Sequence, residues 1–139
     1  MPDASSLERF VEAQNDVYAD AVAELTAGQK QSHWMWFVFP QIKGLGNSPT
    51  AKQYGVKSRA EAVAYLEHAV LGPRLRECTQ LVIDVEGRTI GQIFGYPDDL
   101  KFRSSMTLFA NVTSDNDAFL KALQKYFRGE MDQATLDRL

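Results

Sequence analysis

The sequence predicts an all-α fold, arranged as a single compact domain of about eight or nine short helices rather than as a simple four-helix bundle. Residues that favour helix caps recur along the chain, and apolar residues recur at intervals of three and four between them. The few strand-like stretches are not paired with a hairpin signal. With 139 residues and 45% hydrophobic composition, the chain is expected to form one core, and residues 1–139 are assigned to one domain.

Two helices and an aromatic block are predicted in the N-terminal part of the chain. A capping motif at Ser5 precedes an apolar pattern of helical spacing, which Asn15 and its neighbour divide into two helices. Gly28 offers a left-handed stop for the second helix. Residues 32–40 then read SHWMWFVFP, a segment so apolar that most of its surface is expected to be buried.

The middle of the chain continues with loops and capped helices. At the end of the glycine-rich stretch KGLGNSP, Ser48 and Pro49 have the residue types of a helix cap and a first helical position. Ser58 is expected to cap a helix over residues 59–67. A longer amphipathic helix is predicted to begin near Pro73 and to end before Gly87.

The C-terminal part is predicted to contain four helices. Thr89 caps a short turn, and Pro97 opens a helix over residues 97–112 whose first turn carries two aspartates, as the helix dipole favours. Ser114 or Asp115 is expected to cap the next helix, and Asp132 to cap the last.

Composition excludes several classes of function. With 15 basic and 18 acidic residues the formal net charge is −3, so the chain has no global positive field and nucleic acid is not an expected partner. Cys78 is the only cysteine, which rules out an intrachain disulfide and suits the cytoplasm. Two histidines and one cysteine make a metal site unexpected, and no cofactor is predicted. A signal peptide is not expected, because MPDASSLERF carries acids where a signal peptide carries a basic flank, and no apolar stretch in the sequence approaches membrane-spanning length.

The aromatic block supplies the first candidate site residues. Most of its side chains are expected in the core, but Trp34 or Trp36 needs a partner for its indole N–H and can line a polar pocket, where a flat ring would stack on a base or nicotinamide. His33 precedes them at the predicted helix N-terminus, where the dipole favours a neutral imidazole that can act as a base. The alternative is a buried histidine bonded to a backbone carbonyl.

A second group of candidates lies on the predicted helix over residues 97–112. Lys101, Ser104 and Ser105 share one face, and a lysine beside small hydroxyls can hold a phosphate or carboxylate. Asp99 precedes them and is a candidate for handling protons. The alternative is a solvated helix face, although alanine would suit a helix better than these serines.

The glycine-rich loop supplies a third group. It lacks the spacing of a phosphate-binding loop, but Gln41, Lys43 and the start of the next helix can form a mouth that accepts an anion. Tyr54 follows on that helix. The simpler interpretation is a flexible loop.

Four stretches together resemble a small bacterial family that is defined only as a domain of unknown function and is often labelled calpastatin. They read SHWMWFVFPQIKGLGNSPTAKQYGV, AYLEHAVLGPRLRECT, IFGYPDDLKFRSSMTLF and KYFRGEMDQATLDRL. The resemblance implies an all-helical domain like that of the mycobacterial member, and no particular reaction. The calpastatin label does not fit, because calpastatin repeats are disordered segments whereas this chain can bury its own core.

SPTAKQY, DDLKFRSSM and LQKYF also resemble, more loosely, the family of glycosidases that act on ADP-ribose and NAD-related metabolites. The chain departs from that pattern, because Lys52 and Gln53 stand where such enzymes carry a glutamate.

Two functions are compatible with these observations. The first is a pocket for a small anionic, ring-bearing metabolite of nucleotide, NAD or ADP-ribose type, lined by Trp34 or Trp36 and by Gln41, Tyr54, Lys101 and Ser105. In that pocket His33 or Asp99 would handle protons. The alternative is a non-catalytic protein-interaction module whose partner the sequence does not identify.

Overall fold

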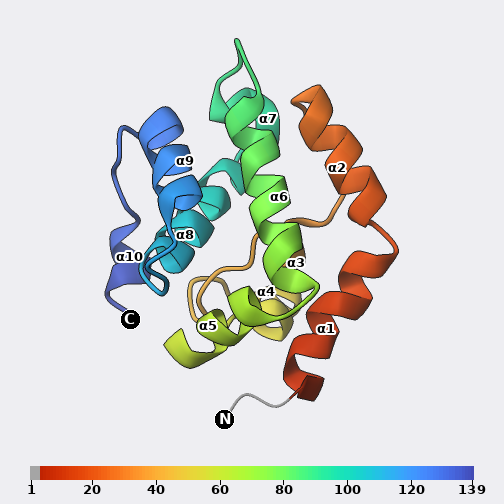
Figure 1. The fold of residues 1–139 in the computed structure, drawn as a ribbon, viewed down its shortest axis with the longest axis vertical. Helices are drawn as coiled ribbons and strands as arrows, with labels where there is room; N and C mark the ends of the chain where they lie inside the picture. Colours follow the sequence, from red (N-terminus) through yellow and green to blue (C-terminus); the bar gives the residue numbers. More distant parts are fainter. Residues whose placement is uncertain (1–3) are drawn as a thin grey trace.

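A central helix, α6 (Leu71–Asp84), contacts helices from both halves of the chain (Figure 1). The structure is a computed structural model that describes the backbone of residues 4–139 and the side chains from Leu7 onward. α6 packs against α2 (Tyr18–Ala27), α5 (Arg59–Glu67) and α9 (Asp117–Phe127). The fold is therefore organised around one helix rather than as a parallel bundle.

The described residues form ten helices, one more than the upper end of the expected range, and no strand longer than an isolated bridge. Besides the four named above, they are α1 (Ala4–Asn15), α3 (Met35–Val38), α4 (Pro49–Tyr54), α7 (Ile90–Phe94), α8 (Asp98–Ala110) and α10 (Gln133–Leu136). The prediction of an all-α domain is confirmed.

Most of the predicted caps are present. The side chains of Ser48, Ser58, Thr89 and Asp132 each accept a hydrogen bond from a backbone N–H in the first turn of the following helix. Gly28 ends α2 with a φ of 77°, a left-handed conformation that glycine adopts without steric cost. Because these signals are local, the sequence locates the corresponding helix ends.

Three details differ from the sequence predictions. The helix expected from Pro73 begins two residues earlier, at Leu71. Asn116, rather than Ser114 or Asp115, precedes α9, and no side chain caps that helix. The cap predicted at Ser5 lies within α1, which includes Ala4, and the side chain of Ser5 is outside the described residues.

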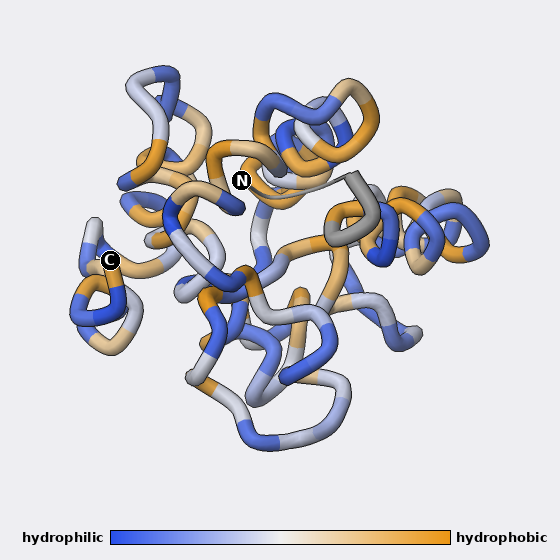
Figure 2. Tube along the Cα trace, turned by 90° about the horizontal axis from the view of Figure 1, so that it is seen from below, coloured by the Kyte–Doolittle hydropathy of each residue, from blue (hydrophilic) through white to orange (hydrophobic). Residues whose placement is uncertain are grey.

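Aromatic side chains from helices far apart in sequence meet in the core. The ring of Phe102 lies 5.0 Å from those of Phe39 and Phe94, measured between centroids. Trp34 also contacts Phe39 and Phe94, and all four of these side chains are buried. The longer helices carry both apolar and polar residues, as the orange and blue segments of the hydropathy colouring show (Figure 2). This core fixes α3 against α7 and α8.

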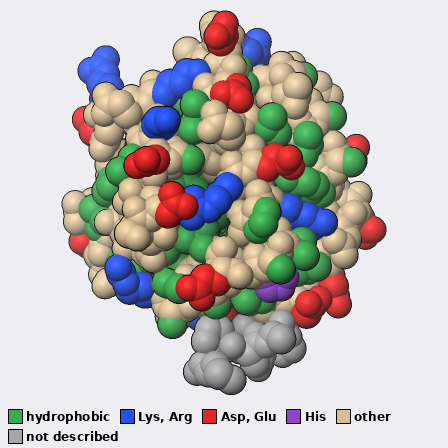
Figure 3. Space-filling view, viewed as in Figure 1, with side chains coloured by type: hydrophobic (Ala, Val, Ile, Leu, Met, Phe, Trp, Pro, Cys, Tyr) green, Lys and Arg blue, Asp and Glu red, His purple; other side chains and the backbone are tan. Residues whose placement is uncertain are grey.

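The surface carries mixed charge. On the face seen in Figure 3, Lys and Arg side chains are interspersed with Asp and Glu rather than collected in one patch. None of the helices in the described part of the chain is long and apolar enough to span a membrane. Neither do the described residues include a group of three or more His, Cys, Asp or Glu side chains placed to hold a metal ion.

Candidate functional site

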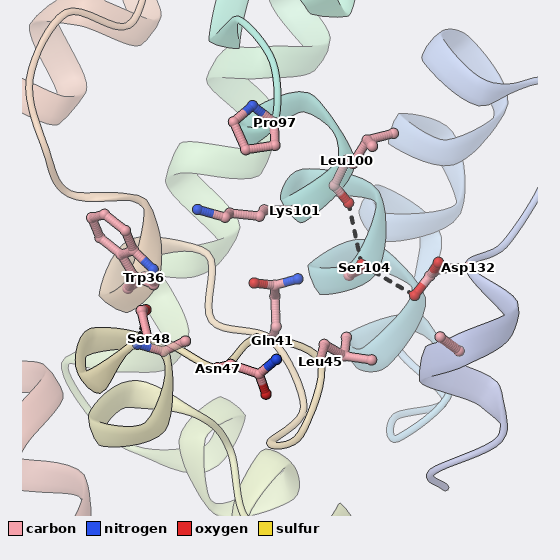
Figure 4. Close-up of a pocket in the computed structure, with 13 residues that line it drawn as sticks. Trp36, Gln41, Leu45, Asn47, Ser48, Pro97, Leu100, Lys101, Ser104 and Asp132 are labelled. Carbon is pink, nitrogen blue, oxygen red and sulfur yellow. Dashed lines mark hydrogen bonds between the residues drawn. The ribbon is translucent and has the colours of Figure 1, made fainter.

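A cavity of about 580 Å³ lies between α8, the loop before α4, and α10 (Figure 4). Its volume is in the range of small-molecule binding sites. The lining residues come from segments far apart in the sequence: Trp36, Gln41, Leu45, Gly46, Asn47, Ser48, Ala51, Pro97, Leu100, Lys101, Ser104, Asp132 and Ala134. The tertiary fold therefore creates the site.

Lys101 extends from α8 toward the aromatic wall of the cavity. Its Nζ lies 4.5 Å from the centre of the Trp36 ring, a distance at which an ammonium group is attracted by the face of an indole. Figure 4 shows the two side chains pointing toward one another. The arrangement places a positive charge beside a flat ring.

Lys101 also forms an ion pair with Asp98. The Asp98 carboxylate lies 3.4 Å from Nζ of Lys101 and 2.9 Å from Nζ of Lys30. The Lys30 ammonium is mostly buried, with 9% of its side chain exposed, whereas Lys101 is 23% exposed. Asp98 therefore keeps a cationic partner if Lys101 moves toward a ligand.

The loop between α3 and α4 forms the floor of the cavity. Lys43 N–H donates to the Val56 carbonyl at 2.7 Å, and Val56 N–H donates to the Gln41 carbonyl at 2.9 Å, which makes a single parallel bridge. The side-chain amide of Gln41 makes no hydrogen bond with other described residues and extends into the middle of the site in Figure 4. An amide so placed can both donate and accept.

Arg138, near the C-terminus, binds the loop that forms this floor. Arg138 donates to the Gly44 carbonyl at 3.2 Å. Gly44 has a φ of 101°, and a Cβ at this position would lie 2.9 Å from the Arg138 guanidinium. The backbone conformation therefore favours glycine at this position, whereas the Arg138 guanidinium, at the end of a flexible side chain, can shift away from a Cβ.

Asp132 supplies the carboxylate of the cavity. Its Oδ2 accepts hydrogen bonds from Ser104 Oγ at 3.1 Å and from the backbone N–H and hydroxyl of Thr135 at 3.1 and 2.6 Å. Arg103, on α8, donates to the carbonyls of Glu130 and Met131, each at 3.0 Å. These bonds attach the segment before α10 to α8.

Four of the residues predicted from the sequence meet in this cavity: Trp36, Gln41, Lys101 and Ser104. Tyr54 lines a small hollow of about 10 Å³ that adjoins the cavity and shares Trp36 and Gln41 with it. Its ring lies 5.2 Å from that of Phe37 and 5.9 Å from that of Phe10, measured between centroids. Tyr54 thus supports the aromatic wall from behind. Lys43 is exposed and does not line the cavity.

Trp34 is not a cavity residue, which corrects one prediction. It is fully buried, and its indole N–H donates to Glu24 Oε1 at 3.0 Å. Glu24 also accepts from the backbone of Gln31 and Ser32 and from the Ser32 hydroxyl. Burial opposes ionisation of Glu24, but these hydrogen bonds outweigh it and lower its pKa to about 2.

Three more predicted site residues lie away from the cavity. His33 is exposed and lines no part of it, and Asp99 Oδ1 accepts from the N–H of Leu100 at 2.9 Å, so it serves its own helix. Ser105 is completely buried, and its hydroxyl has no hydrogen-bond partner among the described residues. A proton-handling role for His33 or Asp99 therefore has no geometric basis.

Asp132 is the charged residue of the cavity that sequence reasoning did not assign to the site. The sequence identified it only as the cap of the last helix, and that role is confirmed. Asp132 and Ser104 are far apart in the sequence, so no local pattern indicated that they lie close together in space. A cap residue is often only a cap, so no local signal marks this one as part of a cavity.

A second hollow of about 390 Å³ lies along α9 and is lined by Asp117, Leu120, Lys121, Leu123, Gln124 and Gly129. Its lining includes no aromatic ring, and all of the lining residues belong to α9 or to the turn after it. The cavity beside α8 is therefore the stronger candidate.

The described residues form a small helical domain with a mixed polar and aromatic cavity, and comparison places the chain in a family. The family model described as a protein of unknown function (DUF1810) matches residues 4–139, so the chain belongs to that family, as its sequence motifs indicated. The crystal structure of a conserved hypothetical protein from Mycobacterium tuberculosis, Rv1873, is 57% identical in sequence and superposes with a TM-score of 0.97. The match covers 99% of this chain and 98% of that one. A search of curated proteins found no match.

Proposed function

We propose that the cavity beside α8 binds a small metabolite that carries an acidic group and a flat ring, of the type found in nucleotides, NAD and ADP-ribose. The observation that carries the proposal is the position of Lys101 Nζ, 4.5 Å from the centre of the Trp36 ring. A ring stacked on Trp36 would bring a neighbouring phosphate or carboxylate within reach of the ammonium group.

The rest of the lining suits such a ligand. The amide side chains of Gln41 and Asn47 supply donors and acceptors, while Leu45, Pro97 and other apolar residues supply apolar contact surface. Because His33 and Asp99 lie outside the cavity, the geometry supports binding rather than a particular reaction. A nucleotide-type ligand also fits a cytoplasmic protein, the location expected from the lone cysteine, Cys78, which is buried and free.

Calorimetry tests this proposal directly. We expect saturable binding of at least one of AMP, NAD or ADP-ribose to the wild-type chain, and a loss of about tenfold or more in affinity for Lys101→Ala, because a charge-assisted hydrogen bond is removed. Lys121→Ala is the matched control, since Lys121 lines the other hollow. The proposal fails if none of the three ligands binds, or if Lys101→Ala binds as the wild type does.

One observation favours the alternative, a protein-interaction module. Tyr96 is 82% exposed and Leu100 is 46% exposed, beside Pro97 at the edge of the cavity. Large exposed apolar side chains are common at protein interfaces. If that function is correct, Tyr96→Ala and Leu100→Glu will abolish the capture of a protein partner, while Lys101→Ala will not.

A further inference from the structure

We propose that Asp132 is the second anchor of the cavity and that it selects ligands carrying a sugar diol in addition to the acidic group. This inference rests on the proposed function and narrows its ligand class to nucleotides with an intact ribose. Asp132 and Lys101 are the two charged residues among those that line the cavity. They carry opposite charge, so they are complementary to different parts of one ligand.

The two oxygens of Asp132 have different environments. Oδ2 accepts three hydrogen bonds, one from Ser104 and two from Thr135. Oδ1 makes no hydrogen bond or ion pair with the part of the chain that the structure describes. An ionised carboxylate only accepts hydrogen bonds, so Oδ1 is available to a donor on a ligand.

The chemistry of that donor follows from the charge. A phosphate placed at Asp132 would be repelled, whereas neutral hydroxyl groups would be held by charge-assisted hydrogen bonds. Carboxylates bind the hydroxyls of a ribose in this way in dinucleotide-binding folds. Asp132 lies beside Ser104, whereas Lys101 extends from α8 toward Trp36 (Figure 4), so the two charged groups are placed to contact different parts of one ligand.

The structure does not require a charged residue at this position. The backbone N–H of Asp132 donates to Thr107 Oγ1 at 2.9 Å, and Arg103 holds the two preceding carbonyls. The segment is therefore fixed without the carboxylate. Asparagine caps helices as well as aspartate does, and its side-chain oxygen can receive the bonds that Oδ2 now accepts. In Asp132→Asn the amide nitrogen would then replace Oδ1, which changes an acceptor into a donor.

The test compares AMP with 2′,3′-dideoxy-AMP, which lacks both hydroxyls of the diol. We expect the wild-type chain to bind AMP about tenfold or more tightly than the dideoxy analogue, since charge-assisted hydrogen bonds are lost. Asp132→Asn should lose this preference and bind the dideoxy analogue as the wild type does. Asp137→Asn is the matched control, because Asp137 is an exposed carboxylate of the same segment and lies outside the cavity.

The outcomes separate this inference from the proposed function. If Asp132→Asn keeps the wild-type preference for AMP, or if the wild type shows no preference, the role of Asp132 is refuted while the cavity remains a binding site. If AMP does not bind to the wild type, the inference is refuted, and the proposed function is refuted with it only if NAD and ADP-ribose also fail to bind. Circular dichroism of each variant establishes that α10 and the rest of the fold are retained.

Discussion

The indole N–H of Trp34 donates to Glu24 Oε1 at 3.0 Å, so the buried tryptophan is fixed by a carboxylate from α2. Trp36, two residues along the chain, lines the cavity instead. The Glu24–Trp34 hydrogen bond thus helps to orient the short helix α3, which begins with Met35 and carries Trp36. Loss of the Glu24–Trp34 hydrogen bond is therefore expected to change the position of Trp36 in the cavity wall.

Glu24 is expected to make the stability of the fold pH-dependent. Its pKa is about 2 in the folded protein and 4.5 without these partners. Because the folded-state pKa is the lower one, the stabilisation is fully present above pH 4.5 and is lost as the pH falls toward 2. In urea unfolding at pH 7, Glu24→Ala should lower the free energy of unfolding by about 1–3 kcal/mol. The difference from the wild type should shrink as the pH falls below 4.5; an equal difference at pH 3 and pH 7 would contradict this assignment.

The two lysines that share Asp98 are expected to contribute unequally to stability. Lys30 is 2.9 Å from the carboxylate and mostly buried, whereas Lys101 is 3.4 Å away and more exposed. Lys30→Met should therefore destabilise the fold by about 1–2 kcal/mol, and Lys101→Met by about 0.5 kcal/mol or less. Chemical denaturation of both variants measures the difference. A larger loss for Lys101→Met would show that this lysine has a mainly structural role.

Ser105 is expected to be unnecessary for both fold and site. Its buried hydroxyl has no partner in the part of the chain that the structure describes, so it incurs a desolvation cost without a compensating hydrogen bond. Ser105→Ala should raise the free energy of unfolding by about 0.5–1 kcal/mol, because alanine is also the better helix former. Thermal unfolding measures the change, and ligand binding should be unaffected. Loss of ligand binding in Ser105→Ala would show that Ser105 contributes to the binding site.

Gly72 is expected to be essential for packing α6 against the end of α5. A Cβ at this position would lie 2.1 Å from the Leu66 carbonyl oxygen, which is a backbone atom and cannot easily move. Gly72→Ala should therefore destabilise the fold by about 3 kcal/mol or more. Gly91→Ala is the control, since its Cβ would meet nothing closer than 3.9 Å. That variant should be neutral or stabilising by up to about 1 kcal/mol, and equal losses in the two variants would contradict the clash.

The local signals of the sequence predicted the fold well. The caps at Ser48, Ser58 and Thr89 and the stop at Gly28 depend on the residue itself and on its near neighbours, so each is visible in the sequence. The aromatic block was harder to interpret. It is apolar on every side, so its pattern could not show that α3 would be only one turn long, with Trp34 inward and Trp36 at the cavity.

The candidate site was predicted only in part, because tertiary packing determines which side chains face the cavity. Helical spacing correctly put Lys101 and Ser104 on one face, but it also included Ser105, which the tertiary fold buries. His33 and Asp99 were chosen for their chemistry, and chemistry alone does not determine which side of a helix or turn faces a cavity. Asp132 reaches the site through the packing of α10 on α8, a long-range contact without a local pattern.

The most direct test of the central claim is a two-dimensional ¹⁵N–¹H NMR titration that follows the indole N–H signals of the two tryptophans, assigned with Trp36→Phe. Trp34 is buried and bonded to Glu24, whereas Trp36 faces the cavity. Addition of AMP or ADP-ribose should shift the Trp36 signal in a saturable manner and leave the Trp34 signal nearly unchanged, and Lys101→Ala should abolish the shift. If neither signal moves, or if Lys101→Ala responds as the wild type does, the cavity does not bind such ligands through Trp36 and Lys101.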